Sequence, residues 1–170
     1  GDSTNIKRIG IDLDKNLYIL DSNTIYKYNI DGIVTGDLSL LGNTLSGRSL
    51  ISYVGGPGEI TDNTRFNNPI SFNIFKNNIY ILDQSANTFY IKKFDTEFNF
   101  IDSYNVSSQL SKYPGIDLMV SEDQVLILSL SGNIIEYDNN LLFKQNYTLF
   151  ENIAIDESYL RLQPSIENNN

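Results

Sequence analysis

The chain has 170 residues, of which 41% are hydrophobic and 19% charged, and its formal net charge is −9. It contains no cysteine, histidine or tryptophan, which excludes disulfides, thiolate or imidazole metal sites, and Ser-His-Asp or Cys-His catalysis. With 12 basic residues against 21 acidic ones and no basic run longer than Lys92-Lys93, it lacks the positive patch that binds nucleic acid, and no stretch approaches the roughly 20 apolar residues of a membrane span.

Four short apolar segments recur along the chain, each after a turn rich in Asp, Asn, Lys or Ser. They are LYIL at 17–20, IYIL at 79–82, VLIL at 125–128 and YLRL at 159–162. A further apolar run precedes each turn, at 9–13, 70–75, 116–120 and 153–155. The pattern of apolar run, polar turn and apolar run predicts a β-hairpin four times.

A third and a fourth strand are expected after the first three hairpins. The segments 24–32, 89–97 and 132–140 alternate apolar and polar residues, and looser strands are expected near 33–38, 98–104 and 141–147. A β-sandwich also has short, regularly spaced strands, but it does not require one four-strand unit to recur. The repeat therefore predicts an all-β chain made of antiparallel four-stranded blades of a β-propeller.

The predicted blades cover approximately residues 6–40, 64–106 and 113–148, with an incomplete fourth blade at 150–170 and an insertion loop at 36–60. Three blades and two strands leave apolar blade faces uncovered at both ends, since each second strand is apolar on both sides. We therefore expect the chain to be part of a larger, six-bladed-like ring or to be completed by another subunit.

Several residues of the best-defined repeat, between 53 and 101, suggest specific backbone roles. Gly55, Gly56 and Gly58 permit positive φ in the loop between blades. Pro69 fixes φ where the innermost strand begins. Asp83 and Asn87 are expected to cap the tight turn between the second and third strands.

This segment, with its Gly-Gly lead, Arg65-Phe66-Asn67, Pro69 and Asp83, resembles an NHL repeat, and residues 6–38 resemble a second one. The resemblance implies a propeller that acts as an interaction scaffold with a protein partner. One branch of the family is a metal-dependent lyase with His ligands, and another binds RNA through a basic face. This chain has neither feature, so we expect no catalytic residues, no cofactor and no metal.

Three motifs could suggest other chemistry. The spacing of Asp12, Asp14 and Asn16 opens like a calcium loop, but the required Gly and Glu are Leu17 and Asn23, which favours a polar hairpin turn. The Gly-rich segment 55–59 is not followed by the Lys-Ser/Thr pair and helix of a phosphate loop. Paired carboxylates, the devices of propeller glycosidases, cannot be placed from spacing alone.

Taken together, these patterns predict a non-catalytic protein-interaction or structural module, with residues 36–52 as the expected contact. Such modules occur as appended domains of phage virion proteins and in bacterial surface or periplasmic proteins, and the sequence does not indicate a compartment. A carbohydrate-active propeller, which binds glycans or cleaves them with acidic residues, stays open as the alternative.

Overall fold

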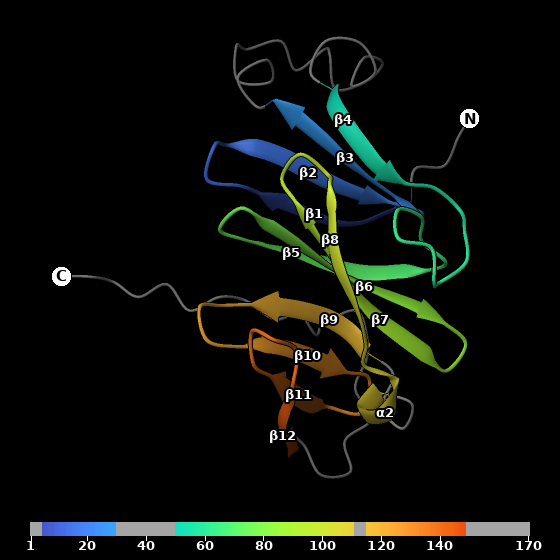
Figure 1. Cartoon of the computed structure of the whole chain (residues 1–170), viewed down its shortest axis with the longest axis vertical. Helices are drawn as coiled ribbons and strands as arrows, with labels where there is room; N and C mark the ends of the chain where they lie inside the picture. Colours follow the sequence, from blue (N-terminus) through green and yellow to red (C-terminus); the bar gives the residue numbers. More distant parts are fainter. Residues whose placement is uncertain (1–4, 30–49, 111–114, 149–170) are drawn as a thin grey trace, which may run out of the picture.

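The computed structural model of the chain describes residues 5–29, 50–110 and 115–148. These residues form three antiparallel sheets of four strands each (Figure 1). The first blade comprises β1 (Ile6–Ile11), β2 (Asn16–Asp21), β3 (Thr24–Asn29) and β4 (Leu50–Gly55). The middle blade comprises β5 (Pro69–Phe75), β6 (Asn78–Ser85), β7 (Thr88–Asp95) and β8 (Phe100–Asn105). After the short helix α2 (Ser107–Leu110), the third blade comprises β9 (Gly115–Val120), β10 (Val125–Ser129), β11 (Asn133–Tyr137) and β12 (Phe143–Thr148).

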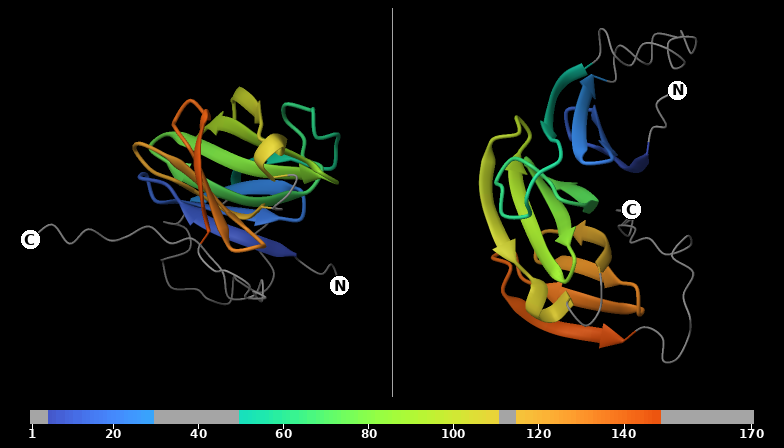
Figure 2. Two further views of the ribbon diagram at one scale, coloured as in Figure 1. Left: turned by 90° about the horizontal axis from the view of Figure 1, so that it is seen from below. Right: turned by 90° about the vertical axis from the view of Figure 1, so that its right-hand side faces the viewer.

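The strands of each blade are hydrogen-bonded in chain order, and the innermost strands of the three blades lie side by side. β5 contacts both β1 and β9, and the three sheets are arranged around a curve (Figure 2). Strands ordered from an inner axis outwards, in sheets stacked face to face, are typical of consecutive propeller blades. The predicted all-β fold with four-stranded antiparallel blades is confirmed.

The three blades also share one register, which makes their positions directly comparable. Each innermost strand has a register irregularity at the same place. It comes just before the residue that pairs with the last residue of the four-residue apolar segment (LYIL, IYIL or VLIL) in the second strand. These pairs are Arg8 with Leu20, Ser71 with Leu82, and Asp117 with Leu128. Such irregularities bend a strand locally, so all three blades bend at the same point.

Each blade has two faces, because side chains alternate along a strand. We call the face towards the preceding blade the leading face, and the face towards the following blade the trailing face. The trailing face of the first blade and the leading face of the middle blade form one core cluster, which contains Tyr18, Leu20, Ile25, Phe72, Ile79 and Ile81. The next junction forms a second cluster, which contains Tyr80, Leu82, Ile91, Leu118, Val125 and Ile127.

The fourth strand of the first blade lies elsewhere than expected. The sequence placed it near 33–38 and treated 36–60 as an insertion loop, but β4 forms inside that range, at Leu50–Gly55. β4 pairs with β3 through Val54 opposite Ile25 and Tyr53 opposite Tyr26, and Val54 is buried in the first core cluster. The segment 33–38 and the predicted fourth blade at 150–170 lie outside the described residues.

The linker from β4 to β5 depends on glycine in two different ways. Gly55 and Gly56 have φ values of +112° and +97°, as predicted, and a Cβ on Gly55 would lie 2.4 Å from the carbonyl oxygen of Asn23. Gly58 does not have positive φ; it is needed for space, since a Cβ there would lie 2.4 Å from that of Arg65. Pro69 begins β5, as expected from its fixed φ.

Candidate functional site

The innermost strands bring three polar side chains together near the inner axis. Asp117 is fully buried, and it accepts a hydrogen bond of 2.6 Å from the hydroxyl of Ser71. It also forms an ion pair with Arg8 and accepts a hydrogen bond of 2.9 Å from the backbone N–H of Leu118. These contacts join the first, middle and third blades, which assigns the cluster a structural role.

Asp83 lies at the junction of the middle blade with the linker, and its role differs from the prediction. The sequence suggested that Asp83 and Asn87 cap the turn between the second and third strands. Instead, the carboxylate of Asp83 accepts hydrogen bonds from the backbone N–H groups of Asn67, at 3.1 Å, and Asn68, at 2.9 Å. Asp83, in β6, therefore fixes the linker residues just before β5, the innermost strand of its blade. It does not cap the turn that follows its own strand.

Lys92 completes this arrangement from β7. Its ammonium group lies 2.9 Å from Asp83 and donates to the carbonyl oxygens of Asp62, at 2.8 Å, and Arg65, at 2.7 Å. The side chains of Lys92 and Asp83 are 1% and 0% exposed. A buried charge is tolerated only when it is paired and hydrogen-bonded, and both conditions are met here. The pair anchors the linker and offers no reactive group to solvent.

The calcium-like motif is a polar hairpin turn, as the sequence favoured. Asp12 accepts hydrogen bonds from the backbone N–H of Asn16, at 2.8 Å, the side-chain amide of Asn16, at 2.9 Å, and the hydroxyl of Tyr18, at 2.9 Å. Burial raises the pKa of Asp12, but the hydrogen bonds from Asn16 and Tyr18 outweigh it, so this pKa lies below its ordinary value. Burial and the bond to Asp12 raise the pKa of Tyr18.

Within the described ranges, no group of three or more acidic side chains is placed to hold a metal ion. Over the same ranges, no helix has both the length and the apolar character needed to cross a membrane. The buried polar side chains of the described residues all have hydrogen-bond partners. These polar clusters therefore have structural roles, and a candidate site for a partner is found on the surface.

The most unusual surface is the leading face of the first blade. Ile9 in β1, Phe72 in β5 and Leu118 in β9 occupy the same register position, opposite Ile19, Ile81 and Ile127 respectively. Ile9 is 64% exposed, whereas Phe72 and Leu118 are 1% and 0% exposed. The same apolar position is therefore buried where a blade precedes it and exposed in the first blade.

The exposed position belongs to a continuous apolar ladder across all four strands of the blade. In the register of the sheet, Ile9 pairs with Ile19, Ile19 with Tyr26, and Tyr26 with Tyr53. The rings of Tyr26 and Tyr53 lie 6.1 Å apart, and Tyr53 is 66% exposed. We call this set, together with Ile11, which is 59% exposed, the open face. Contiguous exposed apolar side chains of this kind are typical of surfaces that contact another molecule.

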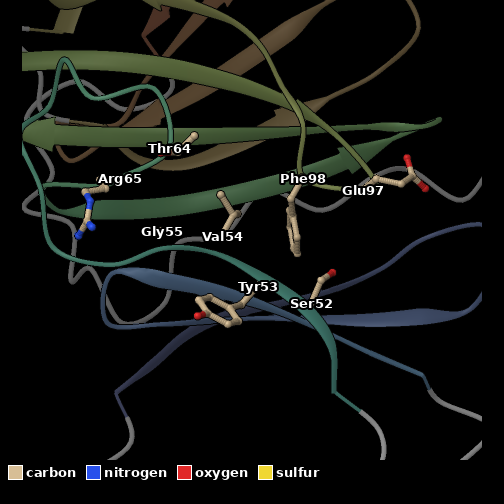
Figure 3. Close-up of a pocket in the computed structure, with 8 residues that line it drawn as sticks. All are labelled: Ser52, Tyr53, Val54, Gly55, Thr64, Arg65, Glu97 and Phe98. Atoms are coloured by element: carbon tan, nitrogen blue, oxygen red, sulfur yellow. The ribbon is translucent and has the colours of Figure 1, made fainter.

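A groove lies at the outer rim between the first and middle blades (Figure 3). It has a volume of about 370 Å³ and carries one positive and one negative side chain, Arg65 and Glu97. Its lining residues are Ser52, Tyr53, Val54, Gly55, Thr64, Arg65, Glu97 and Phe98. Tyr53 contributes to both features, but the groove lies on the trailing side of β4, with Ser52 and Val54, whereas the open face lies on its leading side.

Comparisons with known proteins support the fold. No family model and no curated protein matches the chain. Among solved structures, the chain is similar to the WD40 domain of Neurospora crassa Pan2, with a TM-score of 0.55 and 10% identity, over 84% of this chain and 36% of that one. It is also similar to apo AztD from Citrobacter koseri, with a TM-score of 0.50 and 9% identity, over 82% of this chain and 33% of that one.

The chain therefore spans about a third of the length of each of these solved structures. At such low identity the likeness shows the fold, and the fold is a β-propeller. The finer resemblance to NHL repeats stays a prediction.

Sequence reasoning expected uncovered blade faces but named no residue of the open face. The signal was present in the register, because Ile9 and Ile11 stand where Phe72 and Ile74 stand in the middle blade. The predicted contact at 36–52 lies largely outside the described residues. Ser52, at its end, lines the groove between the first and middle blades.

Proposed function

We propose that this chain is a non-catalytic protein-interaction or structural module, and that the open face of its first blade is the surface that receives a protein partner. One observation carries the proposal. Ile9 is 64% exposed at a position where its counterparts, Phe72 and Leu118, are buried against a neighbouring blade. Covering this face removes apolar surface from water, which is the main driving force of protein association.

The polar side chains favour a scaffold over the carbohydrate-active alternative. The buried acidic residues Asp12, Asp83 and Asp117 accept hydrogen bonds that hold a turn, a linker and the inner axis together. A glycosidase needs two carboxyl groups free to face a sugar across a cleft, and these three are occupied by the fold. The chain also has no tryptophan to stack on a sugar ring.

A rigid module of this kind is suited to be an appended domain in a larger assembly. The settings we include in the proposal are phage virion proteins and bacterial surface or periplasmic proteins. In each setting the module would serve by its shape and its apolar contact rather than by chemistry.

Site-specific photocrosslinking tests the proposal without assuming which protein binds. A photoreactive phenylalanine analogue is placed at position 9, and the chain is expressed in its native host. The matched control carries the analogue at Ile101 in β8, which is 46% exposed but lies outside the open face. We expect a discrete crosslinked protein adduct from position 9 and none from position 101. No adduct from position 9, or equal adducts from both positions, would contradict an interaction role for this face.

A further inference from the structure

The third blade carries the surface that is complementary to the open face. The inner trailing face of the first blade contains Tyr18 and Ile25, which are both 0% exposed against the middle blade. The register places Leu126 and Ile134 at the same positions in the third blade. These two side chains are only half-buried. The trailing face of the third blade therefore carries incompletely covered apolar side chains, on the same face as the buried Glu136.

The two junctions inside the chain show how a trailing face meets a leading face. At the first junction, the backbone of Gly10 on β1 lies directly against the middle blade, since a Cβ on Gly10 would be 2.9 Å from the ring of Phe72. At the second, the side chain of Asn73 on β5 accepts a hydrogen bond of 3.3 Å from the backbone N–H of Val120. In both cases the innermost strands meet, and apolar side chains from the next two strands pack behind them.

From these surfaces we infer that the open face is covered by the third blade of a second copy of this chain. The trailing face of that blade would repeat, between copies, the junction that already occurs twice within each copy. The inference rests on the proposed function, because it names the partner of the same face. The partner is this chain rather than an unrelated protein because one molecule carries both halves of the junction.

Two copies are sufficient if the contacts close. A head-to-tail contact between different surfaces closes into a ring when its rotation allows, and otherwise extends as a filament. The three blades already follow a curve, with the first and third at its two ends (Figure 2). When each copy receives the third blade of the other, both incompletely covered faces of each copy are buried. If two open faces paired with each other, the trailing faces of both third blades would stay incompletely covered.

The first test is the mass of the 170-residue chain in solution, measured by size-exclusion chromatography with light scattering. We expect a species of about 38.6 kDa, which is twice the 19.3 kDa of one chain. Ile9→Asp should reduce the mass to that of one chain, and Tyr53→Asp, on the same face but in another strand, should do likewise. Ile101→Asp is the matched control and should leave the dimer intact. Because Ile9 and Tyr53 are 64% and 66% exposed, both variants should keep the strand-rich circular dichroism of the wild type.

The second test identifies which faces meet, and it uses the absence of cysteine from the chain. By register, Met119 in the third blade corresponds to Gly10, the residue that lies against Phe72, and Ile9 corresponds to Phe72 itself. A mixture of Ile9→Cys and Met119→Cys chains should therefore be joined by a short bismaleimide. Either variant alone should give little product, because its two cysteines lie on separate junctions.

A monodisperse wild-type monomer with a cooperative melt would overturn the inference, and so would open-ended polymers. Efficient crosslinking of Ile9→Cys alone would also overturn it, because that product requires two open faces to meet. These failures differ from failure of the proposed function. A monomer that still captures another protein through position 9 keeps the interaction role and rejects only the second copy, whereas loss of all crosslinks from position 9 rejects both.

Discussion

The first and middle blades consist of the same four strands in the same register, yet they bury their second strands to different extents. In β6 the five residues from Ile79 to Asp83 are all buried, whereas in β2 only Tyr18 and Leu20 are. The middle blade has neighbours on both sides, and the described part of the first blade has one. The difference shows that burial in this fold comes from blade stacking, since a single sheet cannot cover both of its faces.

The largest difference in stability is expected when a charge is placed at the same register position in the middle blade and in the first blade. Ile81 is 0% exposed at the centre of β6, and its counterpart in β2 is the half-buried Ile19. Ile81→Asp should cost about 4 kcal/mol or more, because a carboxylate without a partner is strongly disfavoured in an apolar core. Within a single copy, Ile19→Asp should cost about 1 kcal/mol. Chemical denaturation measures the free energy of unfolding of both variants. Equal losses would contradict the difference in burial between the two blades.

A smaller but substantial effect is expected from the buried ion pair between Lys92 and Asp83, which has no counterpart in the described strands of the first blade. Lys92 in β7 corresponds by register to Tyr26 in β3. Lys92→Met should cost about 3 kcal/mol, because Asp83 stays buried without its partner. Adding Asp83→Asn should restore part of the loss, since the unpaired charge is then removed. If the double variant is less stable than Lys92→Met, the hydrogen bonds that Asp83 accepts from the linker matter more than its charge.

The smallest effect concerns pH and belongs to the first blade. Asp12 directly follows β1 in the first blade, and the residue at the corresponding place in the middle blade is Phe75, the last residue of β5. The pKa of Asp12 is lowered on folding, so the carboxylate stabilises the fold fully above its unfolded pKa of about 3.9 and loses this contribution as the pH falls through the lower, folded value. Asp12→Asn should therefore be less stable than wild type at pH 7, and the gap should narrow below about pH 4. Thermal melts at pH 7 and pH 3 measure this, and a gap that widens in acid would contradict it.

The sequence predicted the second strands well because their apolar runs are short and bounded by polar turns. LYIL, IYIL and VLIL fall inside β2, β6 and β10. It misplaced the fourth strand of the first blade because outer strands are held by one neighbour and have a weaker pattern. Within β4, Tyr53-Val54-Gly55 was interpreted only as the lead of the next repeat.

The side-chain roles could not be predicted to the same degree. In the sequence, Lys92-Lys93 stands out only as the longest basic run, yet Lys92 is fully buried. Its partners Asp62 and Arg65 lie in a linker 27 to 30 residues away. Local spacing describes a turn or a strand, but it does not describe which distant backbone carbonyls a long side chain reaches once the blades are stacked.

The ion pair between Arg8 and Asp117 affects the order in which the three blades unfold. The two residues are 109 positions apart, and the contact passes from the first blade to the third. In linear repeat arrays each unit touches only its neighbours, so end units fray independently. Here the two outer blades are joined directly across the middle one, and closing so long a loop delays this contact until the intervening sheets are in place. Once closed, it ties the loss of either outer blade to the loss of the other, so the described blades should unfold as one cooperative unit rather than in sequence from an end.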